Sequence, residues 1–199
     1  MEKNIKRFSI ALSLGLVFSF LLSLAGFGAC CDSIRRDVIR IHIRANSDST
    51  ADQILKMQVK DKIVELSEEA LSGCQSKQEA MKYLEENLES IREGTEKEVR
   101  RLGYSYPVRL TLQNADFSTR EYENFTLPAG EYDSLCVELG EGAGQNWWCV
   151  IFPGFCLGAA AEGEDFGRKQ AEVMGGKEKY QVRFKIVEIL EDIRSVLNF

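Results

Sequence analysis

The sequence predicts an α+β protein, in which an antiparallel sheet of about four strands packs against an N-terminal helix pair and a C-terminal helix, preceded by a hydrophobic export segment. Three observations predict it: an uncharged stretch from Phe8 to Cys31, short runs that alternate with period two, and longer runs whose apolar residues recur every three or four positions. A chain of 199 residues suits one domain, and 44% hydrophobic with 28% charged residues is a globular composition.

The N-terminal segment predicts export. Lys3, Lys6 and Arg7 precede the apolar run, and positive charge at this place keeps the N-terminus in the cytoplasm while the following chain crosses the membrane. We therefore expect residues 1–31 to be a signal peptide or an N-terminal membrane anchor, with 8–29 as the span, and residues 32–199 to form an extracytoplasmic domain. Whether the segment is cleaved, retained or lipidated at Cys30 stays open.

The charge balance argues against a nucleic-acid partner. The chain carries 25 basic and 31 acidic residues, a net charge of −6, and three of the basic residues lie before the apolar run. No run of basic residues is longer than two, as in the pair Arg100 and Arg101, whereas attraction to phosphates needs a basic patch. Anionic lipid headgroups are equally poor partners for such a surface.

The first element of the domain is a strand followed by a helix. After an expected charged hinge at 32–37, residues 38–44 place isoleucine at every second position, with Arg40, His42 and Arg44 on the other face. Residues 45–50 read Ala-Asn-Ser-Asp-Ser-Thr, and such short polar side chains make turns and cap helices. Apolar residues then recur at helical spacing through about residue 71, which predicts one buried stripe.

A second helix follows closely. Gly73 ends the first helix, and Ser76 with Glu79 fits a capping box. Apolar residues from Ala80 to Leu102 share one side, and Gly103 ends the element. We expect the antiparallel pair to cover one face of the sheet; the alternative is a partner-binding hairpin.

The second half of the chain predicts the remaining strands. Val108, Leu110 and Leu112 alternate with polar residues, and strands at 134–139 and 146–152 flank the glycine-rich residues 140–144, which predicts a hairpin. Residues 159–176 are rich in glycine, alanine and charge, so we expect a mobile surface loop there. One apolar stripe over 177–197 predicts a docked C-terminal helix.

A cysteine–histidine pair is the main enzymatic hypothesis. An exposed thiolate of Cys149 beside His42 would be a competent nucleophile, but nothing in the sequence places the two together. The glycine run at 140–146 leads into a strand and not a helix, unlike a dinucleotide-binding loop. The sequence contains no C-x-x-C spacing, so no cysteine pattern indicates a metal site. We therefore predict no catalytic, cofactor-binding or metal-binding residue.

The cysteines leave alternatives open. Four lie in the domain, at 74, 136, 149 and 156, and four cysteines allow three connectivities. Cys136 and Cys149 lie on strands that we expect to be neighbours, where a disulfide fits. The alternative is that each packs as a small apolar side chain.

Trp147 and Trp148 are unusual because neighbouring side chains on a strand point to opposite faces. One ring must therefore leave the core side. Tryptophan is enriched in interface hot spots, so an outward ring beside a glycine turn suits a docking point. The alternative is that both are buried, one under the helices and one under residues 117–132.

Three blocks of residues resemble the stage II sporulation protein R family. The first runs from Ile41 to Ser49, with Asp52-Gln53 and Leu55-Lys56 after it; the second is 127–132 with the following strand; the third is 140–150, running into Phe152-Pro153. The resemblance covers roughly residues 38–158 in order. The helix at 180–197 has the family's character, and the loop at 159–176 is the least similar part.

This resemblance implies a role in endospore formation. Family members are made in the forespore and exported into the space between the two septal membranes. There they activate an aspartic-type membrane protease, stage II sporulation protein GA, which processes the precursor of the mother-cell sigma-E factor. The expected partners are therefore that protease and, through the N-terminal segment, the membrane, with no nucleic acid and no small-molecule substrate.

The first and third blocks hold the residues that we expect to contact the protease: Arg44, Asn46, Ser47, Asp48, Gly142, Asn146, Trp147 and Trp148. The alternative is that the Asn-Ser-Asp run only caps a helix and the glycines only turn the chain. Two rival functions come from other classes: an exported hydrolase using Cys149 and His42, and a structural septal or envelope protein.

Overall fold

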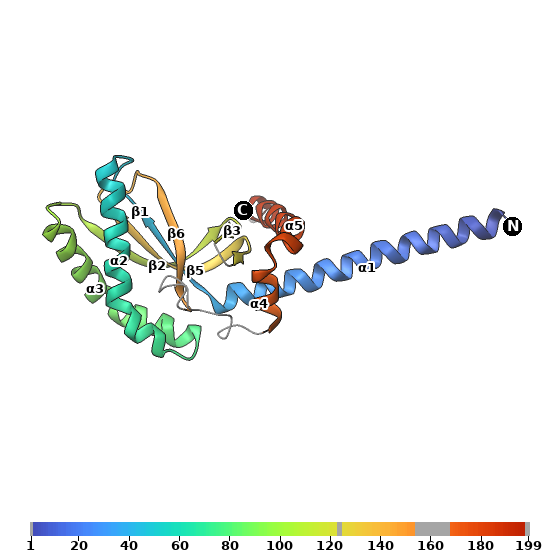
Figure 1. The fold of residues 1–199 in the computed structure, drawn as a ribbon, viewed down its shortest axis with the longest axis horizontal. Coiled ribbons are helices and arrows are strands. Elements are labelled where there is room, and N and C mark those ends of the chain that lie inside the picture. Colours follow the sequence, from blue (N-terminus) through green and yellow to red (C-terminus); the bar gives the residue numbers. More distant parts are fainter. Residues whose placement is uncertain (1, 123–124, 154–167, 198–199) are drawn as a thin grey trace. The chain divides into compact units, whose positions relative to one another are not determined.

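The computed structural model describes residues 2–122, 125–153 and 168–197, and the chain divides into two units. The first unit combines Met1–Ile34, Ser118–Ala129 and Arg168–Phe199. The second combines Arg35–Phe117 and Gly130–Gly167 and holds the main sheet with two long helices (Figure 1).

Helix α1 (Glu2–Asp37) contains the apolar N-terminal segment. It is the one helix among the described residues that is long and apolar enough to cross a membrane, and a signal sequence near an N-terminus has the same length and composition. The expected hinge at 32–37 is wrong, because the helix continues to Asp37. Ile34 is fully buried, and Arg35 and Arg36 favour a helical C-terminus through the helix dipole.

The first unit contains most of α1, a short two-stranded sheet and two C-terminal helices. Strands β3 (Arg120–Glu121) and β4 (Thr126–Leu127) pair antiparallel, and α4 (Arg168–Gly175) precedes α5 (Lys177–Leu197). Helix α4 occupies part of the stretch expected to be a loop, while residues 159–167 of that expectation lie outside the described residues. The C-terminal helix exists as predicted, but it belongs to this unit and not to the one that holds the sheet.

In the second unit, local capping defines the helix pair. Helix α2 (Thr50–Gly73) begins at Ser49, whose hydroxyl accepts a hydrogen bond from the backbone N–H of Asp52. Helix α3 (Lys77–Arg101) begins in the same way at Ser76, which accepts from the backbone N–H of Glu79. Both helices bury their apolar sides in one core with the sheet, so the predicted arrangement is confirmed.

The main sheet contains β1 (Ile39–Arg44), β2 (Val108–Phe117), β5 (Gly130–Leu139) and β6 (Asn146–Phe152), in the order β2-β5-β1-β6. The α+β class is confirmed. The sheet is mixed, however, since β1 runs parallel to β5 while the other pairs are antiparallel.

The predicted hairpin of β5 and β6 is wrong, because β1 lies between them (Figure 1). Alternation fixes which face a side chain takes but not which strand lies alongside. The isoleucines of β1 are fully buried, and a central position in the sheet buries more of their apolar surface than an edge position would. Burial of this surface therefore stabilises β1 as a central strand. Residues 140–145 therefore cross the end of β1 to connect its two neighbours.

The sheet has two unlike faces. The helix-covered face is apolar and includes Ile41 of β1, Leu110 of β2, Leu135 of β5 and Ile151 of β6. The other face carries polar and aromatic side chains from the alternate positions, among them Arg40, His42, Phe117, Ser134 and Trp148.

Candidate functional site

Two loops meet where β1 ends, and both belong to the blocks on which the family resemblance rests. The backbone N–H groups of Ala143 and Gly144 donate to the carbonyls of Asn46 (3.2 Å) and Ala45 (2.9 Å). Side chains add to the contact: Asn46 Oδ1 accepts from the N–H of Glu141 (3.1 Å), and Asp48 Oδ1 accepts from the N–H of Gln145 (2.7 Å). Residues 45–48 and 140–145 thus form one unit, here called the two-loop clamp.

Asp52 organises the clamp from the first turn of α2. Its Oδ2 accepts hydrogen bonds from Ser47 Oγ at 2.5 Å and from Asn46 Nδ2 at 2.9 Å, although the residue is only 4% exposed. The Ser47 hydroxyl, together with the Asn46 amide, holds the pKa of this carboxyl below its usual range, against the opposing effect of burial. Asp52 therefore stays charged and fixes the side chains of the first loop.

Lys56, one turn further along α2, holds the second loop. Its Nζ donates to the carbonyl of Gln145 at 3.0 Å and to Gln53 Oε1 at 2.6 Å. The side chain is 5% exposed, and burial lowers the pKa of its ammonium group while the nearby Asp48 carboxylate raises it. One helix face thus supplies a buried anion to one loop and a buried cation to the other.

The clamp also depends on the absence of side chains at two glycines. Gly140 has φ +58°, a left-handed conformation that favours glycine, and a Cβ there would overlap the Asn46 amide. A Cβ on Gly144 would overlap the backbone carbonyl of Ser47. Backbone cannot move aside as a flexible side chain can, so Gly144 sets how closely the loops approach.

An aromatic stack lies beside the clamp on the sheet face away from the helices. The rings of His42 and Trp148 are stacked at 3.5 Å, and Phe117 meets Trp148 edge-on at 4.8 Å. His42 Nε2 hydrogen-bonds Asn146 Oδ1 at 2.8 Å. Burial lowers the pKa of His42, although the Asn146 bond opposes this, so the ring is neutral at pH 7.

The two tryptophans take opposite faces, as the alternation predicts. Trp147 pairs with Ile43 and is half-buried against the core, with the ammonium of Lys60 5.9 Å from its ring centroid. Trp148 is half-buried on the other face. Neither ring is fully exposed, and both lie near the start of β6, which follows the clamp residues 140–145 in the chain.

Arg44 lies at the exposed end of β1. Its Nη2 pairs with Glu138 Oε1 at 2.9 Å, and Arg109 Nη1 pairs with the other carboxylate oxygen at 2.6 Å. Both arginines are solvent-exposed, so each pair contributes little, about 0–1 kcal/mol, to stability.

The structure brings all eight predicted contact residues to the same end of the sheet. Arg44, Asp48 and Asn146 are exposed, Asn46 and Ser47 are half-buried, and Gly142 is buried inside its turn. Asn46 and Ser47 direct their side chains into the clamp, where both donate to the Asp52 carboxylate, whereas the N-cap of α2 is Ser49. Sequence reasoning missed the roles of Asp52 and Lys56, whose signal is charge on the apolar side of α2 beside Leu55 and Val59.

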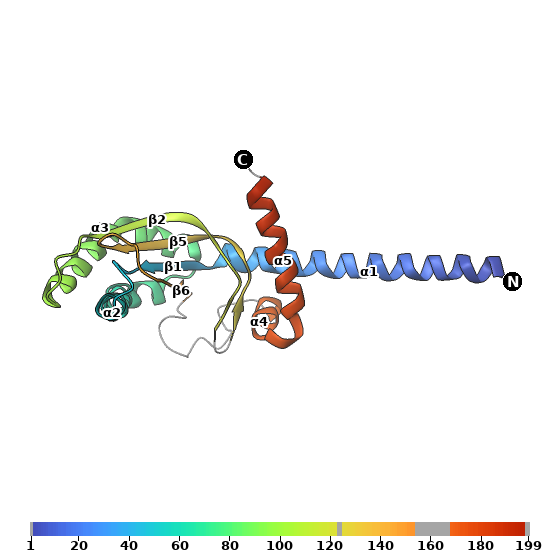
Figure 2. The same ribbon diagram turned by 90° about the horizontal axis from the view of Figure 1, so that it is seen from above.

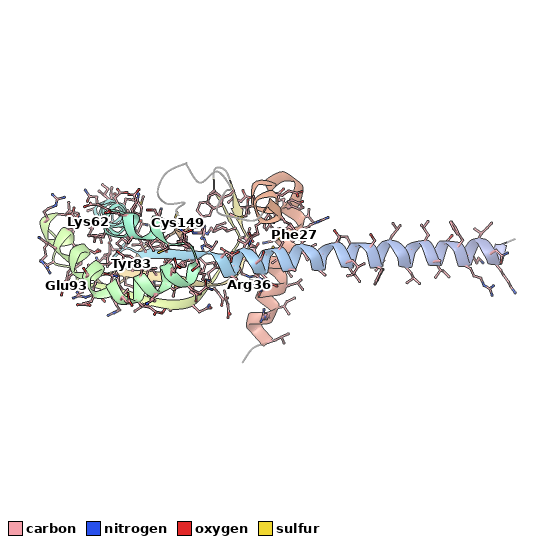
Figure 3. The ribbon with its side chains drawn as sticks, turned by 90° about the horizontal axis from the view of Figure 1, so that it is seen from below. Phe27, Arg36, Lys62, Tyr83, Glu93 and Cys149 are labelled. Atoms are coloured by element: carbon pink, nitrogen blue, oxygen red, sulfur yellow. The ribbon has the colours of Figure 1, made fainter. Side chains whose placement is uncertain are left out.

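The proposed nucleophilic pair is not assembled. His42 pairs with Trp148 across β1 and β6 while Cys149 pairs with Ile41, so their side chains point to opposite faces of the sheet. Cys149, labelled in Figure 3, is disulfide-bonded, and its partner is not Cys136, which has a free thiol. Among the described residues, no three His, Cys, Asp or Glu side chains could hold a metal ion together.

Fold and site together define an α+β protein with an N-terminal helix that meets the length and composition of a membrane span, and with a loop-built surface at one end of its sheet. The sequence model of the family described as stage II sporulation protein R matches residues 35–162. The chain is also 31% identical, over 157 residues, to stage II sporulation protein R of Bacillus subtilis strain 168, covering 79% of this chain and 67% of the relative. This chain belongs to the stage II sporulation protein R family. No solved structure matches it.

Proposed function

We propose that this protein is an exported sporulation signal that passes from the forespore to the septal intermembrane space. There it activates the membrane protease stage II sporulation protein GA, which processes the sigma-E precursor of the mother cell. The family membership carries this proposal, since the matched residues 35–162 include both loops of the clamp. The apolar α1 supports export or anchoring.

The mechanism that we propose is selective binding. A ligand shifts a receptor toward its active state only if it binds that state better than the inactive one. A rigid surface serves this purpose because little conformational entropy is lost on binding. The clamp is rigid in this sense because backbone hydrogen bonds join its two loops. The side chains of Asp52 and Lys56 in α2 also form hydrogen bonds with these loops.

The exposed side chains of the clamp end are the proposed contacts. Arg44 and Asp48 present opposite charges, Asn146 is exposed beside them, and the half-buried Trp147 and Trp148 offer aromatic edges. Asn46, Ser47 and Gly142 support this surface from within. Arginine and tryptophan are among the residue types enriched in interface hot spots.

The experiment measures sigma-E precursor processing in a sporulating host that lacks its own stage II R protein and is supplied with this chain. We expect the intact chain to restore processing and Arg44→Ala to reduce it several-fold. Arg109→Ala is the matched control, because it breaks the other ion pair to Glu138 at a similar small cost in stability. It should process like the intact chain.

Failure of the intact chain to restore processing, with export verified, would count against the proposed function. Equal processing by both arginine variants would instead remove Arg44 from the contact surface. His42→Ala should retain processing if folded; its loss in a folded and exported variant would revive a catalytic role for the histidine.

A further inference from the structure

Helix α5 has two apolar stripes on opposite sides. One is buried in the first unit and contains Tyr180, Phe184 and Val187. At about 100° per residue, the other points the opposite way and contains Val182, Ile186, Ile189, Leu190, Ile193, Val196 and Leu197. Apart from the half-buried Ile186, the members of this outer stripe are 48% to 74% exposed.

The exposed apolar surface of the protein is concentrated in two helices. Apart from Ile54 and Met57 of α2, every exposed large apolar side chain of the described residues lies in α1 or α5. Soluble proteins rarely expose large apolar patches, and those that occur mark interaction sites, so the outer stripe is a candidate binding surface.

The packing of α5 against α1 indicates what covers the outer stripe. Phe27 of α1, labelled in Figure 3, contacts Tyr180 and Phe184, with ring centroids 5.4 Å and 5.1 Å apart. Phe27 lies about 29 Å along the helix from Phe8, at a rise of 1.5 Å per residue, and a bilayer's hydrocarbon core is about 30 Å thick. With Phe8 at one edge of the hydrocarbon, the contact therefore holds α5 at the other.

The direction of α5 agrees with this position. It runs across α1 and not along it (Figure 2). If α1 spans the membrane, α5 lies near the membrane plane and turns its outer stripe away from α1 toward neighbouring lipid. Lys185 is exposed at one side of the stripe, where its long side chain can reach the headgroups, whereas the guanidinium of Arg183 lies 5.9 Å from the ring centroid of Phe27 and 5.5 Å from that of Tyr180.

A second copy of the chain fits the stripe less well. Residues 182, 186, 189, 193 and 196 have heptad spacing, but they extend over only about two heptads, while coiled coils are recognised over three or four. Leu190 and Leu197 also widen the stripe beyond a narrow coiled-coil seam.

We propose that the outer stripe of α5 is a lipid-binding surface, which lies in the outer interface of the same membrane that α1 spans. This inference is independent of protease activation. It assigns the C-terminal helix a role in fixing the protein at the membrane surface.

Photo-crosslinking of the full chain in phosphatidylcholine vesicles with an alkyne-tagged phospholipid tests the proposal. The photoreactive residue p-benzoylphenylalanine is placed at Leu190 in the stripe, at Gln181 on the exposed polar side of the same helix, or at Phe18 in α1 as the positive control. We expect Leu190 to label lipid at least about fivefold more than Gln181, and to approach Phe18.

Equal lipid labelling at Leu190 and Gln181, with Phe18 labelled, would overturn the proposal. So would a dominant crosslinked product at twice the chain's mass, which would assign the stripe to a second copy. Hydrogen exchange provides a second measurement: vesicles should protect residues 186–197 of the intact chain, and Ile193→Glu should remove this protection while Gln181→Glu retains it. Unchanged exchange in Ile193→Glu would also contradict lipid contact.

Discussion

His42 is the only histidine in the chain, so its protonation can be followed without ambiguity. Because burial lowers its pKa, the ring should titrate below about 6.5, the ordinary value. Asn146 favours the protonated form, so Asn146→Ala should lower this pKa further. Both predicted pKa values can be measured from the imidazole proton chemical shifts as a function of pH, with the full chain in micelles. A histidine that titrates above 6.5 would contradict the buried stack.

The sign of the accompanying stability change follows from linkage. A folded-state pKa below the unfolded value means that folding disfavours the protonated ring. His42 therefore contributes stability above about pH 6.5 that is lost as pH falls through its folded pKa.

Substitution of Asp52 should lower the free energy of unfolding. Asp52→Asn removes a charged acceptor from Ser47 and Asn46, so we expect a loss of about 1–3 kcal/mol in unfolding free energy at pH 7. The folded pKa of Asp52 is lowered, so this contribution is present above about pH 4 and is lost as pH falls through the folded value. Urea unfolding in micelles, followed by tryptophan fluorescence, measures it.

Asp61→Asn is the control for this experiment. Asp61 is exposed on the same helix, so its change should stay within about 0.5 kcal/mol. Equal stability of the two variants at pH 7 would show that Asp52 does not support the clamp.

Among the elements, the clamp makes the clearest prediction. Gly144→Ala places a Cβ against the Ser47 carbonyl, so the loops must separate, at a cost of about 1–3 kcal/mol. Gly73→Ala, at the end of α2, meets nothing within 4 Å and should be neutral or stabilising. Thermal unfolding of both variants compares them. A Gly144→Ala variant as stable as Gly73→Ala would mean that the loops are not tightly apposed.

The sequence predicts elements where the signal is local. Helix α3 begins at its expected cap, Ser76, and α2 begins at Ser49, inside the polar cluster 45–50 expected to start it, because each serine bonds a group only three residues away. The neighbours of β1 could not be predicted, since its partners lie about 100 residues ahead and alternation is the same for any neighbour. The two site loops were recognised by resemblance, but the bond from Lys56 to Gln145 depends on that same long-range pairing.

At the scale of the whole molecule, the two units should lose structure separately. Phe184 is buried against Phe27 in the first unit, while every core residue of the sheet lies in the second. Phe184→Asp should therefore expose α5 to hydrogen exchange by at least about tenfold, as expected for a charge placed in an apolar contact. Amides of β1 and β5 should keep their protection. Loss of protection in β1 would show that the units unfold together.

The central place of β1 has a consequence for how the chain matures. Synthesis delivers β1 directly after α1, yet its two neighbours are β5 and β6, which end at Leu139 and Phe152. Helices α2 and α3 can form early from local signals, whereas the apolar β1 must wait for about 110 further residues before it is covered. At about 5–20 residues per second, that interval lasts roughly 5–20 s. During this window β1, the strand that follows α1, lacks both of its neighbours, so the protein should become resistant to protease digestion only late in its synthesis.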